Sequence, residues 1–370
     1  MANPAIPTTY GVDFRSFQNY VSGISLQLHI TAECDNNCKH CYMRDSPFYA
    51  NEIKNPLKKS EFIQLINEYF AFLSEFSATG SIVLTGGDPL LSPNFWDILN
   101  HIHENYSSQC SVFVLGNSSR VDSSSASLMQ QMGVSGYQIS IDGLATTHDY
   151  LRSTGSFADA FRALKIIHDV GMRAICAFTV TKFNANEYLH LYNYVRNLRY
   201  IDAFGFDRMI PIGKGITMID QLFTSTEYRQ FLFDVFKYEA FNYSGIISRK
   251  EQMWRPFLYE LGLVDPISED EATPFREGCC CGTGNTSILA DGTMLPCRKM
   301  NISAGKYPER SFRELFINND VVRLLRQYNK YDSCTQCEVN SICRGCPSMK
   351  YAVSGDIFSC DPYCWRANND

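Results

Sequence analysis

The sequence has 370 residues, of which 45% are hydrophobic and 13% aromatic, and this is enough apolar material for a large folded core. Intrinsic disorder, a coiled coil and a small disulfide-linked module are therefore excluded. Its 33 basic and 39 acidic side chains give a net charge of -6, which does not favour nucleic-acid binding. No apolar run reaches the roughly 18 residues of a membrane span, and no signal peptide precedes Gly11, so we expect a cytoplasmic protein.

Short β-rich apolar segments alternate with helical periods between residues 24 and 208. The predicted strands are residues 24–30, 81–85, 110–116, 136–142, 173–180 and 202–208. This alternation is typical of successive βα units around a parallel sheet. We therefore expect an α/β fold that contains six such units.

Two helices are clearly marked by apolar residues at helical spacing. Ser60 is the expected N-cap of the first helix, whose apolar stripe runs from Phe62 to Phe76. The second helix follows Ser156, and Gly171 is well placed to end it in the left-handed conformation. Stripes of this kind are core packing rather than cofactor contacts.

Beyond the sixth strand the chain changes character. We expect an N-terminal extension (1–23), a barrel (24–225), a helical linker (226–275) and a Cys-rich domain (276–370). Within the Cys-rich domain only residues 312–328 have a helical pattern, and apolar residues are few. This composition predicts that metal, rather than a hydrophobic core, organises the domain.

The chain has 15 cysteines, and three of them, Cys34, Cys38 and Cys41, directly follow the first predicted strand. In a reducing compartment, clustered cysteines more often hold metal or do redox work than form disulfides. Three thiolates on one loop can bind an iron–sulfur cluster and leave one iron open. A zinc knuckle is the alternative, with His40 or His29 as fourth ligand, although His40 is poorly placed between two cysteines.

This loop resembles the hallmark of the radical SAM superfamily, whose fold is a partial (β/α)6 TIM-like barrel. In that family the three cysteines bind a four-iron cluster, and its open iron binds the amino and carboxylate groups of S-adenosylmethionine (SAM). The resemblance implies the same fold and the same cofactors for this chain.

Residues Thr85 to Pro89, with the sequence TGGDP, end the second predicted strand. Alone, such a sequence is more often an ordinary turn. Its position one βα unit after the cysteine loop favours its resemblance to the GGEP-type motif of the family, which binds the methionine amino group, with Asp88 in place of the usual Glu. By the same resemblance, the cofactor contacts are His40, Thr85, Gly86, Gly87, Asp88, Asn117, Ser140, Asp142 and Arg152.

The C-terminal cysteines resemble the SPASM extension of radical SAM enzymes, which binds up to two auxiliary four-iron clusters. The resemblance assigns Cys281, Cys297 and Cys346 to the first auxiliary cluster and Cys334, Cys337, Cys343 and Cys364 to the second, for three clusters in all. A double zinc site is the alternative. It is less compatible, because zinc ribbons separate their CxxC pairs by about 12 to 20 residues and the gap here is five.

Three departures from the SPASM pattern leave ligands open. Arg344 and Gly345 supply two residues before Cys346 where three are usual. Ser287 stands where some relatives have a fourth ligand to the first auxiliary cluster, so Cys279 or Cys280 could substitute, or one iron could be open. In the second auxiliary cluster, Cys360 competes with Cys364.

The resemblance implies reductive cleavage of SAM to a 5'-deoxyadenosyl radical that abstracts hydrogen from a substrate; no catalytic side chain is assigned. SPASM enzymes chiefly act on peptides, so we expect modification of a ribosomally synthesised peptide by a thioether or carbon–carbon cross-link, or a related oxidation. Sulfatase maturation is disfavoured, because those enzymes carry an acidic residue where this chain has Arg298, and a guanidinium cannot act as a base.

Two alternatives stay open: a radical SAM dehydrogenase or rearrangement enzyme acting on a small molecule, and a non-catalytic iron–sulfur electron carrier. About 23 residues precede the first strand, so we expect that binding of a leader peptide would require a separate leader-binding protein or another surface of this chain. The expected reductant is a flavodoxin- or ferredoxin-like protein, with no nucleic-acid or membrane partner.

Overall fold

The computed structural model describes residues 23–265, 278–327 and 332–367. Most of the expected N-terminal extension, the expected boundary near residue 275 and the last residue of the helix expected at 312–328 therefore lie outside the described residues.

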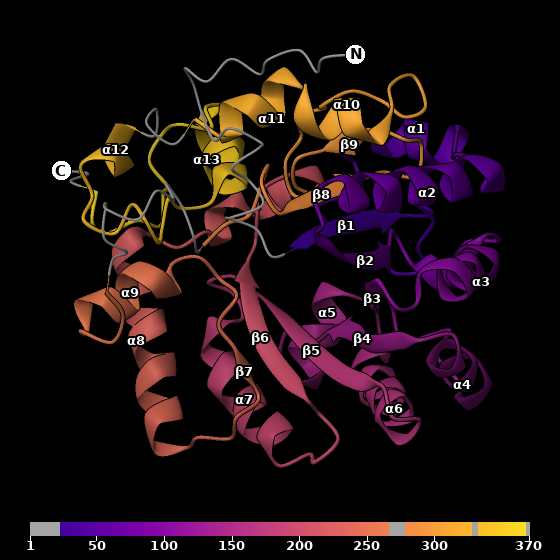
Figure 1. Cartoon of the computed structure of the whole chain (residues 1–370). Coiled ribbons are helices and arrows are strands. Elements are labelled where there is room, and N and C mark those ends of the chain that lie inside the picture. Colours follow the sequence, from indigo (N-terminus) through magenta and orange to yellow (C-terminus); the bar gives the residue numbers. More distant parts are fainter. Residues whose placement is uncertain (1–22, 266–277, 328–331, 368–370) are drawn as a thin grey trace.

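A parallel sheet of six consecutive strands forms the centre of the molecule (Figure 1). The strands are β1 (Gly23–His29), β2 (Thr79–Thr85), β3 (Cys110–Leu115), β4 (Val134–Ser140), β5 (Arg173–Val180) and β6 (Ala203–Arg208). They are neighbours in chain order, each parallel to the next. The six predicted strands and the partial (β/α)6 barrel are thus confirmed, with strand ends shifted by at most two residues.

Three further short strands extend this sheet at its two edges. They are β7 (Ile247–Ser248), parallel to β6, and the pair β8 (Asn285–Ile288) and β9 (Met294–Leu295). β8 lies parallel to β1, with Ser287 opposite Gln27, so the Cys-rich domain continues the barrel sheet. The sequence pattern did not predict these strands.

Helices cover the outer face of the sheet (Figure 1). The N-terminal two thirds of the chain contain α1 (Tyr49–Lys54), α2 (Lys59–Glu75), α3 (Phe95–Tyr106), α4 (Ser123–Gln131), α5 (Ala145–Leu151), α6 (Ser156–Asp169), α7 (Tyr188–Arg196), α8 (Ser225–Phe241) and α9 (Trp254–Glu260), with short 3-10 turns η2 (Pro89–Leu91), η3 (Ala185–Glu187) and η4 (Gly213–Gln221).

The ends of two helices test the sequence expectations directly. The prediction of Ser60 as an N-cap was wrong, because α2 begins at Lys59 and the amide of Lys58 donates instead to the Glu61 carboxylate (2.7 Å). Gly171, with φ of +86°, follows α6 in the left-handed conformation, as predicted.

The Cys-rich domain contains α10 (Phe312–Ile317), α11 (Asp320–Leu325), α12 (Asp332–Thr335) and α13 (Pro347–Ser354). The single helix expected from residue 312 is therefore two helices, because the Asn319 side chain accepts from the amides of Val321 and Val322 and starts a new one. Residues 332–335 and 347–354 were not predicted as helices.

The expectation that metal alone organises this domain was also wrong. Phe312 and Phe316 are fully buried and contact the Phe72 ring on α2 at centroid distances of 5.4 and 5.6 Å. Their cluster of buried side chains is continuous with the barrel core, which includes Ile288 and Met294. Apolar packing thus holds the first half of the domain against the barrel.

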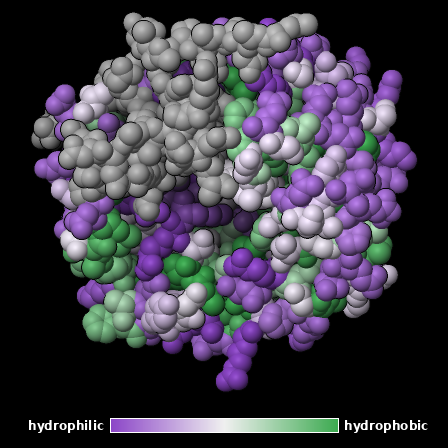
Figure 2. Space-filling model, viewed as in Figure 1, coloured by the Kyte–Doolittle hydropathy of each residue, from purple (hydrophilic) through white to green (hydrophobic). Residues whose placement is uncertain are grey.

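The surface drawn in Figure 2 is mostly hydrophilic, with hydrophobic side chains gathered over α8 and α9. Leu261 and Leu263, which follow α9, are 38% and 56% exposed. In the described residues, no helix combines the length and the apolar character needed to cross a bilayer.

Candidate radical SAM and auxiliary-cluster sites

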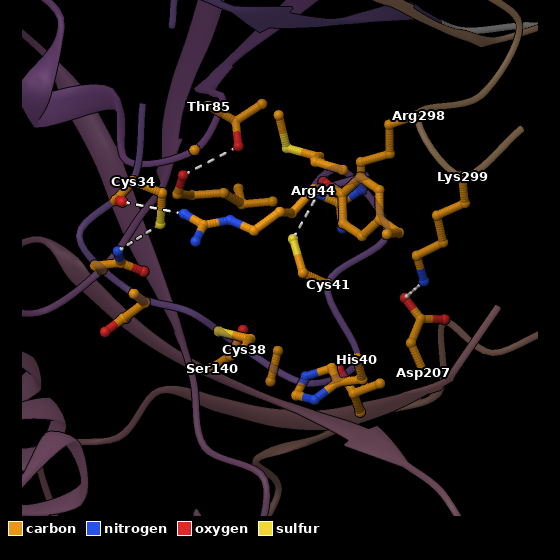
Figure 3. A pocket seen from close by; sticks show the side chains of 18 of the residues that line it. Cys34, Cys38, His40, Cys41, Arg44, Thr85, Ser140, Asp207, Arg298 and Lys299 are labelled. Carbon is orange, nitrogen blue, oxygen red and sulfur yellow. Dashed lines mark hydrogen bonds and ion pairs between the residues drawn. The ribbon is translucent and has the colours of Figure 1, made fainter. Parts of the chain in front are cut away.

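The loop after β1 places three cysteines at the carboxyl ends of the barrel strands. Cys34, Cys38 and Cys41 line a cavity of about 170 Å³, here called the first cavity. Figure 3 shows the three sulfurs entering it together with Thr85 and Ser140. Parallel strands gather functional groups at this end, so the arrangement follows directly from the fold.

Each of the three sulfurs accepts at least one hydrogen bond. The donors are Nδ2 of Asn117 to Cys34 (3.3 Å), Nη1 of Arg152 to Cys38 (3.7 Å) and the amide of Arg44 to Cys41 (3.3 Å). Donors of this kind stabilise thiolates and tune the potential of a cluster that thiolates bind.

Burial acts against free thiolates at this site. It raises the pKa of the Cys34 thiol. It also raises the pKa of the Cys38 thiol, to about 11. Thiolates here therefore require a bound cation, and three cysteines with donors to their sulfurs beside an open cavity fit an iron–sulfur cluster with one free iron.

The Gly86–Pro89 motif packs directly against the cysteine loop. The amide of Gly87 donates to the Thr31 carbonyl (2.9 Å) and the amide of Asp88 to the Glu33 carbonyl (2.8 Å). A Cβ on Gly87 would lie 2.1 Å from the Glu33 oxygen, so only glycine permits this approach. The motif and the loop are thus one rigid unit.

Most of the predicted cofactor contacts meet in this cavity. Its lining includes His40, Thr85, Gly86, Gly87, Asn117, Ser140 and Arg152 but not Asp88 or Asp142. The Asp88 side chain is buried and accepts from the amide of Leu90, at the start of η2 (3.3 Å). Burial raises the pKa of this carboxyl to about 6. Asp88 therefore stabilises the turn that follows the two glycines and does not line the cavity.

Asp142 lies beneath the cavity wall and orients two groups that do reach it. Its Oδ2 accepts from Nε of Arg152 at 2.6 Å and lies 3.1 Å from Nε2 of His40, while Oδ1 accepts from the amide of Thr179. Burial alone would raise the pKa of Asp142, but Arg152 and His40 hold it well below its usual range. The carboxylate is therefore charged and fixes the Arg152 guanidinium beside Cys38.

A second cavity, of about 370 Å³, lies between the barrel and the Cys-rich domain. Cys279, Cys297 and Cys346 line it, and both Cys279 and Cys297 form side-chain hydrogen bonds with Cys281. The bond with Cys281 lowers the pKa of Cys297 to about 6. Four cysteines thus meet here, one more than the sequence assignment of three.

Cys280 and Ser287, which the sequence pattern associated with the first auxiliary cluster, do not line the second cavity. Cys280 is exposed, and its carbonyl accepts the amides of Thr283, Gly284 and Asn285 in a tight turn. Ser287 is fully buried in β8, and its hydroxyl donates to Oε1 of Gln27 at 3.3 Å.

A third, small cavity is lined by five cysteines: Cys334, Cys337, Cys343, Cys360 and Cys364. Nζ of Lys350 donates to the Cys334 sulfur (3.7 Å) and the amide of Gly345 to the Cys343 sulfur (3.4 Å). Cys360 and Cys364 are hydrogen-bonded to each other. Both candidates for the last ligand therefore reach the same cavity.

Several residues that the sequence analysis did not single out complete the two larger cavities. Tyr42, Arg44, Asp207, Lys250 and Lys299 all line the first cavity. Tyr42 and Arg44 directly follow Cys41, and that position is a signal that sequence reasoning could have used. The other three come from β6 and from segments beyond it, and no motif marks them.

Comparison with known proteins identifies the family. The Radical SAM superfamily model matches residues 28–216, and the SPASM model, an iron–sulfur cluster-binding domain, matches residues 279–338. The AdoMet-dependent heme synthase of Methanosarcina barkeri is 25% identical over 347 residues, covering 90% of this chain and 94% of that protein. Mycofactocin maturase MftC of Mycobacterium tuberculosis is 22% identical, covering 94% and 84%.

Among solved structures, Streptococcus suis SuiB bound to its precursor peptide SuiA superposes with a TM-score of 0.73 at 16% identity. The match covers 95% of this chain and 77% of SuiB, and at this identity it supports the fold. The chain belongs to the radical SAM superfamily and carries a C-terminal SPASM domain.

Proposed function

We propose that this protein is a radical SAM/SPASM enzyme that cleaves SAM and modifies a ribosomally synthesised peptide, by a thioether or carbon–carbon cross-link or a related oxidation. The observation that carries the SAM-dependent part is that the cysteine loop lines one cavity together with Gly86 and Gly87, with a hydrogen-bond donor at each sulfur. The peptide substrate is supported by similarity to maturases such as MftC.

The residues of the first cavity have separate tasks in this proposal. Cys34, Cys38 and Cys41 hold a four-iron cluster, which when bound supplies the electron that cleaves SAM to methionine and a 5'-deoxyadenosyl radical. The Gly86 and Gly87 backbone binds the methionine end of SAM. The remaining predicted contacts, Asn117, Ser140, Arg152 and His40, orient the rest of it, and the buried wall around them excludes water.

Two auxiliary clusters complete the proposed cofactor set. Cys279, Cys281, Cys297 and Cys346 bind the first, and Cys334, Cys337, Cys343 and either Cys364 or Cys360 bind the second. The proposed barrel spans residues 24–225 and the cluster domain 276–370, joined by a helical linker. A flavodoxin- or ferredoxin-like protein supplies electrons, and a separate leader-binding protein presents the peptide.

A second candidate function is favoured by one observation. The heme synthase relative matches along 94% of its own length, which supports an enzyme that acts on a small molecule such as a tetrapyrrole. Incubation with a precursor peptide encoded beside the gene, read by peptide mass and by 5'-deoxyadenosine, separates the two. A mass change supports the maturase, and SAM cleavage without any peptide modification favours the second candidate.

The cluster assignment has its own test. Anaerobic reconstitution should load about twelve irons per chain, and replacing Cys34, Cys38 and Cys41 together by Ala should remove about four of them and all 5'-deoxyadenosine formation. Zinc in place of iron after strictly anaerobic purification would contradict the proposal. Intact iron loading without SAM cleavage would leave a non-catalytic electron carrier.

A further inference from the structure

Three cationic side chains line a wall that the first and second cavities share. Lys250, Arg298 and Lys299, here called the cationic belt, contribute to the lining of both cavities. Of these two cavities, the cysteines of the loop after β1 line only the first, and Cys279, Cys297 and Cys346 line only the second. The belt therefore lies between the proposed radical source and the first auxiliary cluster.

The belt carries more positive charge than its surroundings neutralise. Asp207 lies 3.0 Å from Nζ of Lys299 and 3.8 Å from Nζ of Lys250, both on Oδ2. The Arg298 guanidinium stacks over the Tyr42 ring at 5.5 Å, and no carboxylate within the described residues pairs with it. Three cations thus face one carboxylate.

Among the other charged side chains that line these cavities, Arg44 donates to Oδ1 of Asn37 (3.0 Å) and to the Cys34 carbonyl (3.3 Å), and the rest form ion pairs. Arg152 pairs with Asp142, and Arg208 with Glu251 and Asp361. The belt therefore has more cations than carboxylates, and cations in a partly enclosed space attract an anion strongly.

The belt does not coincide with the groups assigned to SAM. In Figure 3, Arg298, Lys299 and Asp207 lie on the opposite side of the first cavity from Cys34 and Ser140. A role only in offsetting the charge of the auxiliary cluster does not explain Asp207, which reduces the positive charge at the centre of the belt. Asp207 instead holds the ammonium groups of Lys250 and Lys299 in fixed positions, and an anion-binding site requires donors that are fixed in this way.

We propose that Lys250, Arg298 and Lys299 bind a carboxylate of the substrate and hold it between the SAM site and the first auxiliary cluster. The substrate is thus an aliphatic carboxylate, supplied either by an acidic side chain of a peptide or by a carboxylate-bearing small molecule. This inference rests on the proposed function, because it assigns the substrate of the same site.

The test uses two pairs of probes with the reconstituted enzyme under anaerobic conditions. Hemin, which carries two propionates, is compared with hemin dimethyl ester by absorbance titration. A fluorescein-labelled, C-terminally amidated peptide with one Glu is compared with its Gln counterpart by fluorescence anisotropy. Each pair differs in charge and hardly in shape, so only recognition of the carboxylate separates its members.

The variants are Lys250→Met and, as a matched control, Lys237→Met on the exposed face of α8. Lys250 is distant in sequence from every cysteine, and the iron content of its variant verifies cluster assembly. At least one acidic probe should bind about tenfold or more tightly than its neutral partner, as expected for a charge-assisted contact. Lys250→Met should weaken that preference, because only Arg298 and Lys299 remain in the belt, and Lys237→Met should retain it in full.

Preference for hemin assigns the small molecule as the source of the carboxylate, and preference for the Glu peptide assigns the peptide. Equal binding of acid and neutral partners, an unchanged preference in Lys250→Met, or no binding of either acidic probe would overturn the inference. Formation of 5'-deoxyadenosine by the unaltered enzyme is measured on the same preparation. Its absence would contradict the proposed function, whatever the probes do.

Discussion

Arg208 at the end of β6 and Asp361 in the C-terminal segment form a buried ion pair, with Nη1 and Oδ1 2.7 Å apart and side chains 3% and 1% exposed. Nε of Arg208 also pairs with Glu251 at 2.8 Å. Oδ2 of Asp361 accepts the amide of Cys346 at 2.7 Å. One carboxylate therefore ties the barrel to a predicted ligand of the first auxiliary cluster.

The first prediction concerns this ion pair. Asp361→Ala leaves a buried guanidinium short of one partner, so we expect the apparent free energy of unfolding to fall by about 3 to 5 kcal/mol. Urea denaturation followed by circular dichroism measures it. Asp97→Ala is the matched control, because its pair with Lys59 is about half exposed (56% and 55%) and should contribute less than about 1 kcal/mol. Equal losses in the two variants would show that the buried pair has no special role.

Glu52 gives a prediction about pH. It is buried on α1, its carboxylate accepts the amide of Ala290 at 3.2 Å, and burial raises its pKa to about 7. Because the folded pKa exceeds the unfolded value, the stabilising contribution is complete below about pH 4.5 and is lost as pH rises through 7.

The Glu52→Gln variant should therefore unfold at a higher temperature than the unaltered protein at pH 8 and show a much smaller gain at pH 5. The difference at pH 8 has an upper bound of about 3 kcal/mol. Thermal unfolding at several pH values measures it, with Glu104→Gln on the exposed face of α3 as control. A pH-independent effect of Glu52→Gln would show that this carboxyl does not titrate between folded and unfolded states as described.

The sequence was sufficient for the six barrel strands because each has a local apolar pattern and a helix-forming segment beside it. It was insufficient for β8, whose pairing joins Ser287 to Gln27 across 260 residues. A four-residue strand inside a cysteine-rich segment has no local periodicity that distinguishes it from a turn. For the same reason the sequence underestimated the core beneath Phe312, which exists only through contact with α2.

The candidate site divides in the same way. The cysteine loop and the Gly86–Pro89 motif are each a short continuous segment, and Gly86 and Gly87 line the first cavity together with the three cysteines. Whether a side chain reaches the cavity or supports it depends on rotamer and burial, so the supporting positions of Asp88 and Asp142 required coordinates. Lys250 joins the site only because the chain returns to β6 through β7.

Gly87 gives a prediction that separates backbone shape from side-chain chemistry. A methyl group at Gly87 would meet the Glu33 carbonyl at 2.1 Å, so Gly87→Ala must displace the motif from the cysteine loop. We expect SAM cleavage to fall by at least about 100-fold, since displacement of a cofactor-binding element by about 1 Å has that effect. The measurement is 5'-deoxyadenosine formed per enzyme.

Gly171→Ala is the matched control for Gly87→Ala. Gly171 has a left-handed backbone, with φ of +86°, and no atom lies within 4 Å of the Cβ that would be added. This variant should lose about 1 kcal/mol of stability and retain SAM cleavage. Comparable loss of cleavage in both variants would indicate general destabilisation rather than a displaced motif.

The adjacent residues Cys279 and Cys280 give the last prediction, because they differ in position rather than chemistry. Cys279 lines the second cavity and hydrogen-bonds Cys281, whereas Cys280 is exposed and contributes its carbonyl to a turn. Cys279→Ala should therefore degrade the first auxiliary cluster, with a loss of up to about four irons, and stop substrate turnover while uncoupled 5'-deoxyadenosine formation persists. Cys280→Ala should retain iron and turnover. Iron analysis and electron paramagnetic resonance of the reduced proteins distinguish the outcomes, and unchanged iron in Cys279→Ala would mean that three thiolates suffice and one iron is open.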